Sequence, residues 1–103
     1  MVGYQSGLEA GKDPFVQGNA RVRLSFARDQ VSVGFSGVTS MDLERSLERF
    51  GFDNIQLAAN GAFDGFDDGF VEGAFFGPAH EEVAGMFQKN DNNVIGSFGA
   101  VRE

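Results

Sequence analysis

The chain offers few side chains that could perform nucleophilic catalysis. It contains no Cys and a single His, His80, which follows Gly77-Pro78-Ala79. A Ser nucleophile needs an adjacent base, and the Ser of Gly34-Phe35-Ser36-Gly37 has the wrong spacing for a nucleophile elbow. We therefore expect His80 to be an exposed turn residue, and we predict that the protein has no catalytic residues and is not an enzyme.

The segment that comes nearest to a metal site is Asp64-Gly65-Phe66-Asp67-Asp68-Gly69. A calcium-binding EF-hand loop requires acidic residues at positions 1, 3 and 5, Gly at 6 and Glu at 12. Position 3 of this segment is Phe66 and position 12 is Phe75, so the pattern fails. We interpret the segment as a hairpin loop kept soluble by its acids. No phosphate-binding Gly loop is present either, so no metal and no cofactor is expected.

The composition describes one small acidic domain over residues 1–103. Apolar residues make up 42% and charged residues 22% of the chain, which is ordinary for a globular domain. Eight basic against fifteen acidic residues give a net charge of −7. Nucleic acid is therefore excluded as a partner, because phosphate contacts need clustered Lys and Arg. No apolar run approaches the ~20 residues of a membrane helix.

Alternation of apolar and polar residues predicts an all-β fold. Val22, Leu24 and Phe26 share one face of residues 20–26, and alternation resumes at residues 31–36 after a short polar break. Two such runs around a polar break are typical of a hairpin. Further strands are predicted over residues 2–8, 55–63, 69–77, 82–88 and 93–101.

Several predicted strands place Gly on the same face as Val and Phe, as at Gly73, Gly85 and Gly96. Gly permits sharp curvature, and twelve Phe residues could fill a narrow interior. We therefore predict a small antiparallel β-barrel of about eight strands, with a two-layer sandwich as the alternative. The side chains predicted to fill it are Val22, Leu24, Phe26, Val33, Phe35, Leu57, Phe75, Phe87 and Phe98.

One stretch departs from the β pattern and predicts a short helix over about residues 40–50. Leu43, Leu47 and Phe50 are spaced i, i+4 and i+7, Ser40 can cap the start, and Gly51 suits the end. The helix would lie in a connection and seal an open end of the barrel; the alternative is that it binds a partner.

Two motifs resemble a known family. The run Val71-Glu72-Gly73-Ala74-Phe75-Phe76-Gly77-Pro78-Ala79-His80-Glu81-Glu82-Val83-Ala84-Gly85-Met86-Phe87 is similar to a signature of the transferrin-binding protein B β-barrel family. The closing Val94-Ile95-Gly96-Ser97-Phe98-Gly99-Ala100 resembles that family's last strand. The resemblance covers most of residues 18–103. His80 and Ala84 depart from it, and the predicted helix lies where the family would have a loop and strand.

The resemblance implies a function. Members of the family are bacterial surface lipoproteins that bind host proteins, including transferrin and complement regulators, and some relatives acquire haem. A non-catalytic surface or secreted protein-interaction module is therefore expected, with a role in iron acquisition. Its location would be the outer membrane surface or the extracellular space, and membrane attachment would need a lipid anchor outside this chain. The partner would be another protein, such as one of the host.

Binding residues are expected in loops at the ends of the barrel, because loops on a rigid scaffold usually carry them. Phe50, Phe52 and Phe66 are the predicted partner-binding residues, since aromatic residues dominate interface hot spots. The alternative for each is that it packs against a barrel end.

A second function remains open, that of a lipocalin-like carrier holding a small apolar ligand or haem in the barrel. An eight-stranded barrel is only just wide enough for its own side chains, so we expect the interior to be filled. The inward glycines are the argument for a cavity.

Overall fold

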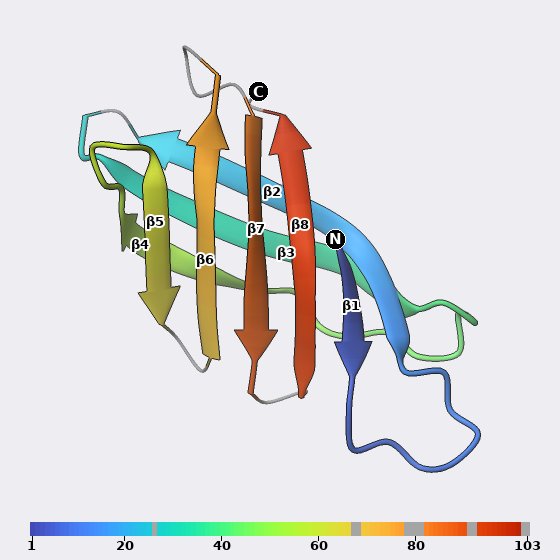
Figure 1. Ribbon diagram of the computed structural model, residues 1–103. Coiled ribbons are helices and arrows are strands. Elements are labelled where there is room, and N and C mark those ends of the chain that lie inside the picture. Colours follow the sequence, from blue (N-terminus) through green and yellow to red (C-terminus); the bar gives the residue numbers. More distant parts are fainter. Residues whose placement is uncertain (26, 67–68, 78–81, 91–92, 102–103) are drawn as a thin grey trace.

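The computed structural model describes residues 1–25, 27–66, 69–77, 82–90 and 93–101, and these residues form an all-β fold (Figure 1). The strands are β1 (Val2–Gln5), β2 (Phe15–Ser25), β3 (Gln30–Ser40), β4 (Phe50–Gln56), β5 (Ala62–Phe66), β6 (Gly69–Phe76), β7 (Glu82–Lys89) and β8 (Val94–Val101). None of the described segments is a helix of the length and apolarity needed to cross a membrane.

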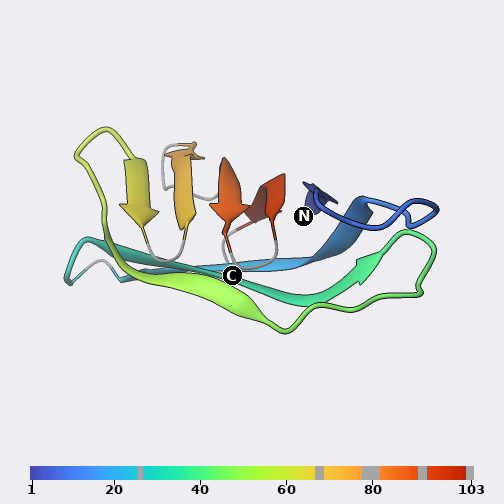
Figure 2. The same cartoon turned by 90° about the horizontal axis from the view of Figure 1, so that it is seen from below.

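All eight strands pair antiparallel in the order β4-β3-β2-β1-β8-β7-β6-β5. The two ends of this sheet meet where Leu57 bridges Phe63 and where the Ala58 N–H donates to the Ala62 carbonyl at 2.8 Å. The result is a nearly closed barrel, as the sequence predicts. It is flattened, because β5–β8 cross over the layer formed by β2–β4 (Figures 1 and 2).

The core lies between these two layers. Its buried apolar residues are Val16, Val31, Val33, Phe35, Val38, Phe52, Ile55, Phe63, Val71, Phe75, Val83, Phe87, Val94 and Phe98. Five of the predicted interior residues are therefore buried: Val33, Phe35, Phe75, Phe87 and Phe98. Three more are partly buried against them: Val22, Leu24 and Leu57. The ninth, Phe26, is outside the described residues.

Phenylalanine rings pack against the inward-facing glycines. Gly85 pairs with Gly73 on one side and with Phe98 on the other. A Cβ atom on Gly85 would lie 2.7 Å from Cζ of Phe98, and one on Gly96 would lie 2.9 Å from Cε1 of Phe87. Contacts this short are not tolerated by real Cβ atoms, so the rings occupy the space that the missing side chains leave.

The predicted helix over residues 40–50 is wrong. β3 continues to Ser40, and the chain then turns back along the same strand, with the Leu47 N–H donating to the Val38 carbonyl at 2.8 Å and Thr39 bridging Ser46. Leu43 has a left-handed φ of 63°, which no α-helix of L-residues contains. The returning chain forms hydrogen bonds with the open edge at the end of β3. A three-turn helix would have had to satisfy its backbone groups without such partners, and short helices are only marginally stable by themselves.

The strand predicted over residues 55–63 is also two elements. β4 ends at Gln56, and the chain crosses to the other layer before β5 begins at Ala62. The Gly61 N–H donates to the Ala58 carbonyl at 3.0 Å, and Gly61 has a φ of 88°, so the crossing is a tight turn that needs Gly. The expected acidic loop is shorter than predicted, since Asp64, Gly65 and Phe66 belong to β5.

Candidate protein-binding surface

Exposed apolar side chains gather on the outside of one end of the barrel. We call it the apolar strip, and its members are Val2, Tyr4, Phe15, Met41, Leu43, Met86 and Ile95, all of them exposed. Monomeric domains rarely expose contiguous apolar surface of this kind unless it binds something.

The central part of the strip is fixed by strand register. Tyr4 of β1 pairs with Phe15 of β2 on one side and with Ile95 of β8 on the other. The Tyr4 and Phe15 rings meet edge to face, with centroids 5.5 Å apart. Val2 lies two residues from Tyr4 and faces the same way, because Gly3 between them points inward. This central part of the strip therefore belongs to the regular sheet.

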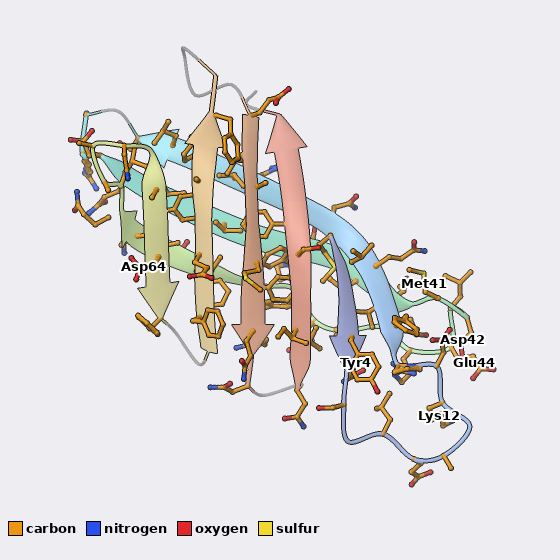
Figure 3. The ribbon with its side chains drawn as sticks, viewed as in Figure 1. Tyr4, Lys12, Met41, Asp42, Glu44 and Asp64 are labelled. Atoms are coloured by element: carbon orange, nitrogen blue, oxygen red, sulfur yellow. The ribbon has the colours of Figure 1, made fainter. Side chains whose placement is uncertain are left out.

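The strip continues onto the turn after β3. The Met41 N–H donates to the Phe15 carbonyl at 2.9 Å, which places Met41 beside the start of β2. Figure 3 shows Tyr4, Met41, Asp42 and Glu44 gathered at this end.

Hydrogen bonds inside the turn fix its shape. The buried Ser40 hydroxyl donates to Asp42 Oδ1 at 2.5 Å and accepts from the Arg45 N–H at 3.0 Å. Asp42 Oδ1 also accepts from the Glu44 N–H at 3.1 Å. The Ser40 hydrogen bond above all, then the Glu44 N–H and the charge of Arg45, lower the pKa of Asp42 below its ordinary value. Ser40, expected to cap a helix, caps a tight turn together with Asp42 instead.

Leu43 stands at the tip of this turn with 73% of its surface exposed and a φ of 63°. A large apolar side chain is uncommon in the left-handed region, which costs on the order of 1–2 kcal/mol for a residue with a Cβ atom. Neither burial nor backbone preference explains Leu43 at this position. Strained, exposed residues of this kind collect at functional sites.

Contacts with β1 hold the turn against the barrel. The Arg45 Nη2 atom donates to Gln5 Oε1 at 3.0 Å, while its Nε and Nη1 atoms are buried and meet no acceptor among the described residues. The Gln5 N–H donates to the Pro14 carbonyl at 2.8 Å, which joins the loop over residues 6–14 to the same end. Both long loops thus lie side by side at one end of the barrel (Figures 1 and 2).

The residues predicted to bind a partner lie in three different environments. Phe52 is 1% exposed and packs in the core. Phe50 is partly buried, with its ring 5.0 Å from that of Phe35 and 5.6 Å from that of Phe87. Phe66 is 81% exposed at the end of β5, a strand that contributes no residue to the apolar strip and lies four strands from β1 in the sheet. The structure does not bring the three together.

Sequence reasoning missed every member of the strip. One signal was available, because Ile95 and Met86 alternate with inward Val94, Gly85 and Phe87 and must therefore point outward. Alternation could not predict that β1, β2 and the turn after β3 lie together, since this depends on strand pairing. His80 lies outside the described residues, and the described residues hold no group of three or more His, Cys, Asp or Glu side chains placed to bind a metal.

These features define a small antiparallel β-barrel that presents an apolar surface at one end. The family model for the C-lobe and N-lobe beta barrels of Tf-binding protein B matches residues 17–102, and the chain belongs to this family. The resemblance seen in the sequence motifs is therefore confirmed.

Two curated relatives carry the name Transferrin-binding protein B. The protein of Neisseria meningitidis serogroup B is 40% identical over 68 residues, which cover 60% of this chain and 11% of that protein. The protein of Moraxella catarrhalis is 52% identical over 33 residues, which cover 32% of this chain and 5% of that protein. The matched region is thus a small part of each relative. No solved structure matches the chain.

Proposed function

We propose that this chain is a non-catalytic protein-interaction module of a bacterial surface or secreted protein, and that it contacts a host protein of the transferrin type. The observation that carries the proposal is the apolar strip, which ends on the strained and exposed Leu43. Membership in a family named for binding transferrin supports the kind of partner. The same membership supports a location at the outer membrane surface or outside the cell.

The strip has the features of an interface core. Exposed Tyr4 and Phe15 form an aromatic pair on a rigid sheet, and aromatic residues are enriched among binding hot spots. Leu43 and Met41 extend this surface on a turn that is already ordered by hydrogen bonds to Ser40 and Phe15. Preorganised side chains lose little conformational entropy on binding, so more of the contact energy appears as affinity. Phe66 is proposed as a separate, peripheral contact.

The packing of the interior supports this function over that of a small-ligand carrier. The Phe35 ring lies 4.4 Å from the Phe87 ring and 5.5 Å from the Phe98 ring, measured between centroids. The space beside Gly85 and Gly96 is taken by those same rings. The argument that inward glycines leave room for a flat apolar ligand is therefore weakened.

Binding to immobilised serum transferrin tests the proposal. Leu43→Ser should weaken binding about tenfold, since truncating a hot-spot residue costs roughly 1–2 kcal/mol. Phe76→Ser is the matched control, because Phe76 is also a large, exposed apolar residue but lies on β6, outside the strip. Phe66→Ser measures the peripheral contact separately.

Two results would overturn the proposal. If wild-type protein binds neither transferrin nor any other protein retained specifically from host serum, the host-binding function is wrong. If Leu43→Ser and Phe76→Ser weaken transferrin binding equally, the apolar strip is not the contact surface.

A further inference from the structure

A basic groove lies on the outer face of the layer formed by β2, β3 and β4. Figure 2 shows this layer on the opposite side of the barrel from β5–β8. Arg21 and Arg23 of β2 line one side of the groove and Arg49, just before β4, lines the other. All three side chains are exposed. The acidic residue in the groove is Asp53, so its lining carries more positive than negative charge, although the whole chain has a net charge of −7.

Two glycines leave the middle of the groove floor without side chains. Gly34 of β3 pairs with Arg21 on one side and with Gly51 of β4 on the other, so two glycines lie in a row across the strands. A Cβ atom on Gly34 would meet nothing nearer than the Arg21 carbonyl at 4.0 Å, so this part of the floor is open to a ligand. Ser32 and Ser36 lie on either side of Gly34 and add hydroxyl groups to the lining.

The arginines of the groove are not held in ion pairs by the residues that the structure describes. Among the described residues, none of Arg21, Arg23 and Arg49 makes an ion pair or a side-chain hydrogen bond with another described residue. The exposed acids of the opposite layer, Asp64 and Glu72, lie on the outer face of β5 and β6 and are separated from the groove by the core. The groove therefore presents three exposed guanidinium groups against one carboxylate, that of Asp53. Guanidinium groups bind carboxylates through paired, charge-assisted hydrogen bonds.

The spacing of these groups fits an extended acidic chain. Arg21 and Arg23 are alternate residues of one strand, so their Cα atoms are about 6.6–6.8 Å apart. Carboxylates on alternate residues of an extended peptide have the same separation. The groove spans three strands, or about 9.5 Å between the β2 and β4 axes, which is wide enough for one extended chain lying over the glycines.

We propose that this groove is a second binding site, independent of the apolar strip, and that it holds an extended acidic segment of a partner protein with carboxylates on alternate residues. Arg21 and Arg23 bind successive carboxylates from one side, Arg49 binds the segment from the other, and the Gly34–Gly51 floor lets the peptide backbone approach the sheet. The preference for an acidic segment depends on the charges close to the groove. At physiological ionic strength, the electrostatic effect of acids farther away than about 8 Å is largely screened.

Fluorescence anisotropy with two labelled peptides tests the site. One peptide alternates Glu with Thr over eight residues, and the other has the same composition with its Glu residues contiguous. The alternating peptide should bind more tightly, and its affinity should fall as NaCl is raised. Arg21→Gln and Arg23→Gln should each weaken its binding about threefold, and the double variant about tenfold. Lys12→Gln is the matched control, because it removes one positive charge from the loop over residues 6–14 (Figure 3) and should leave the affinity unchanged.

Gly34→Glu tests the floor of the groove directly. Its carboxylate would face Arg21 across the strand pair and occupy the floor, so it should abolish peptide binding without unfolding the barrel. Gly34→Ala, which adds only a methyl group, should retain the circular dichroism spectrum and most of the binding. Loss of affinity in Lys12→Gln equal to that in Arg23→Gln would overturn the proposal. So would binding of a sulfated oligosaccharide through these arginines in the absence of peptide binding. Neither result involves Leu43 or transferrin, so this proposal and that of the apolar strip fail separately.

Discussion

Replacing Gly85 with Ala tests whether the inward glycines are packing positions for phenylalanine rings. The added Cβ atom would clash with the Glu72 carbonyl oxygen and would lie 2.7 Å from Cζ of Phe98. The ring can move slightly, but the carbonyl belongs to the backbone of the neighbouring strand β6 and cannot rotate away. Overpacking of this kind costs about 1–3 kcal/mol.

An opposing effect reduces that cost. Ala restricts the unfolded chain more than Gly does, which stabilises the folded state by about 0.4–1 kcal/mol. We therefore expect Gly85→Ala to lower the free energy of unfolding by about 1–2 kcal/mol. For a domain of this size the melting temperature should fall by roughly 5–15 °C.

Gly99→Ala is the matched control, because Gly99 lies on the adjacent strand β8, faces outward, and would place its Cβ atom 3.7 Å from the Val83 carbonyl, an ordinary contact. Its stability should equal or exceed that of the wild type. Urea unfolding followed by far-ultraviolet circular dichroism measures both variants, since the chain has no Trp. Equal stability of the Gly85 and Gly99 variants would refute the packing argument.

Three further predictions concern the turn and the exposed aromatic residue. Leu43→Asn should raise the free energy of unfolding by about 0.5–1 kcal/mol relative to Leu43→Ala, since Asn tolerates a φ of 63° better. The urea midpoints of the two variants measure this difference, and equal midpoints would contradict the argument that Leu43 is strained. Because hydrogen bonds lower the pKa of folded Asp42, its contribution to stability is complete above the ordinary carboxyl pKa and is lost as the pH falls through the lowered value. Asp42→Asn should therefore flatten the acid limb of the stability profile, and an unchanged limb would contradict this. Phe66→Ala should change the free energy of unfolding by less than about 0.5 kcal/mol in the same urea assay. Phe63→Ala truncates a buried ring and should lower it by about 3–5 kcal/mol. Similar losses in the two variants would contradict the assignment of Phe66 as exposed and Phe63 as buried.

The sequence alone was enough to predict most of the strands and the inward side of each. This succeeds because the side-chain period of two is a local property of extended backbone, so Val33, Phe35, Phe87 and Phe98 reveal their face without knowledge of their neighbours. The alternation of Gly with Val and Phe likewise indicated a curved barrel, and the motifs over residues 71–87 and 94–100 indicated the family.

The connection over residues 41–49 shows where local reasoning ends. Leu43, Leu47 and Phe50 have helical spacing, and Ser40 is a good helix cap, so every local signal favours a helix. The end of β3 offers backbone donors and acceptors that the returning chain pairs with instead. These hydrogen-bonding groups are in place only after β2 and β3 have paired. The sequence of the connection therefore does not predict them.

Both proposed surfaces were decided by the tertiary structure. The apolar strip joins Tyr4, Phe15, Met41 and Ile95, which are far apart in the chain and meet only because β1 pairs with both β2 and β8. The basic groove likewise needs Arg21 and Arg49 on either side of one pair of glycines, in a chain whose overall composition is acidic. Periodicity fixes which way a side chain points, whereas long-range strand register fixes which side chains become neighbours.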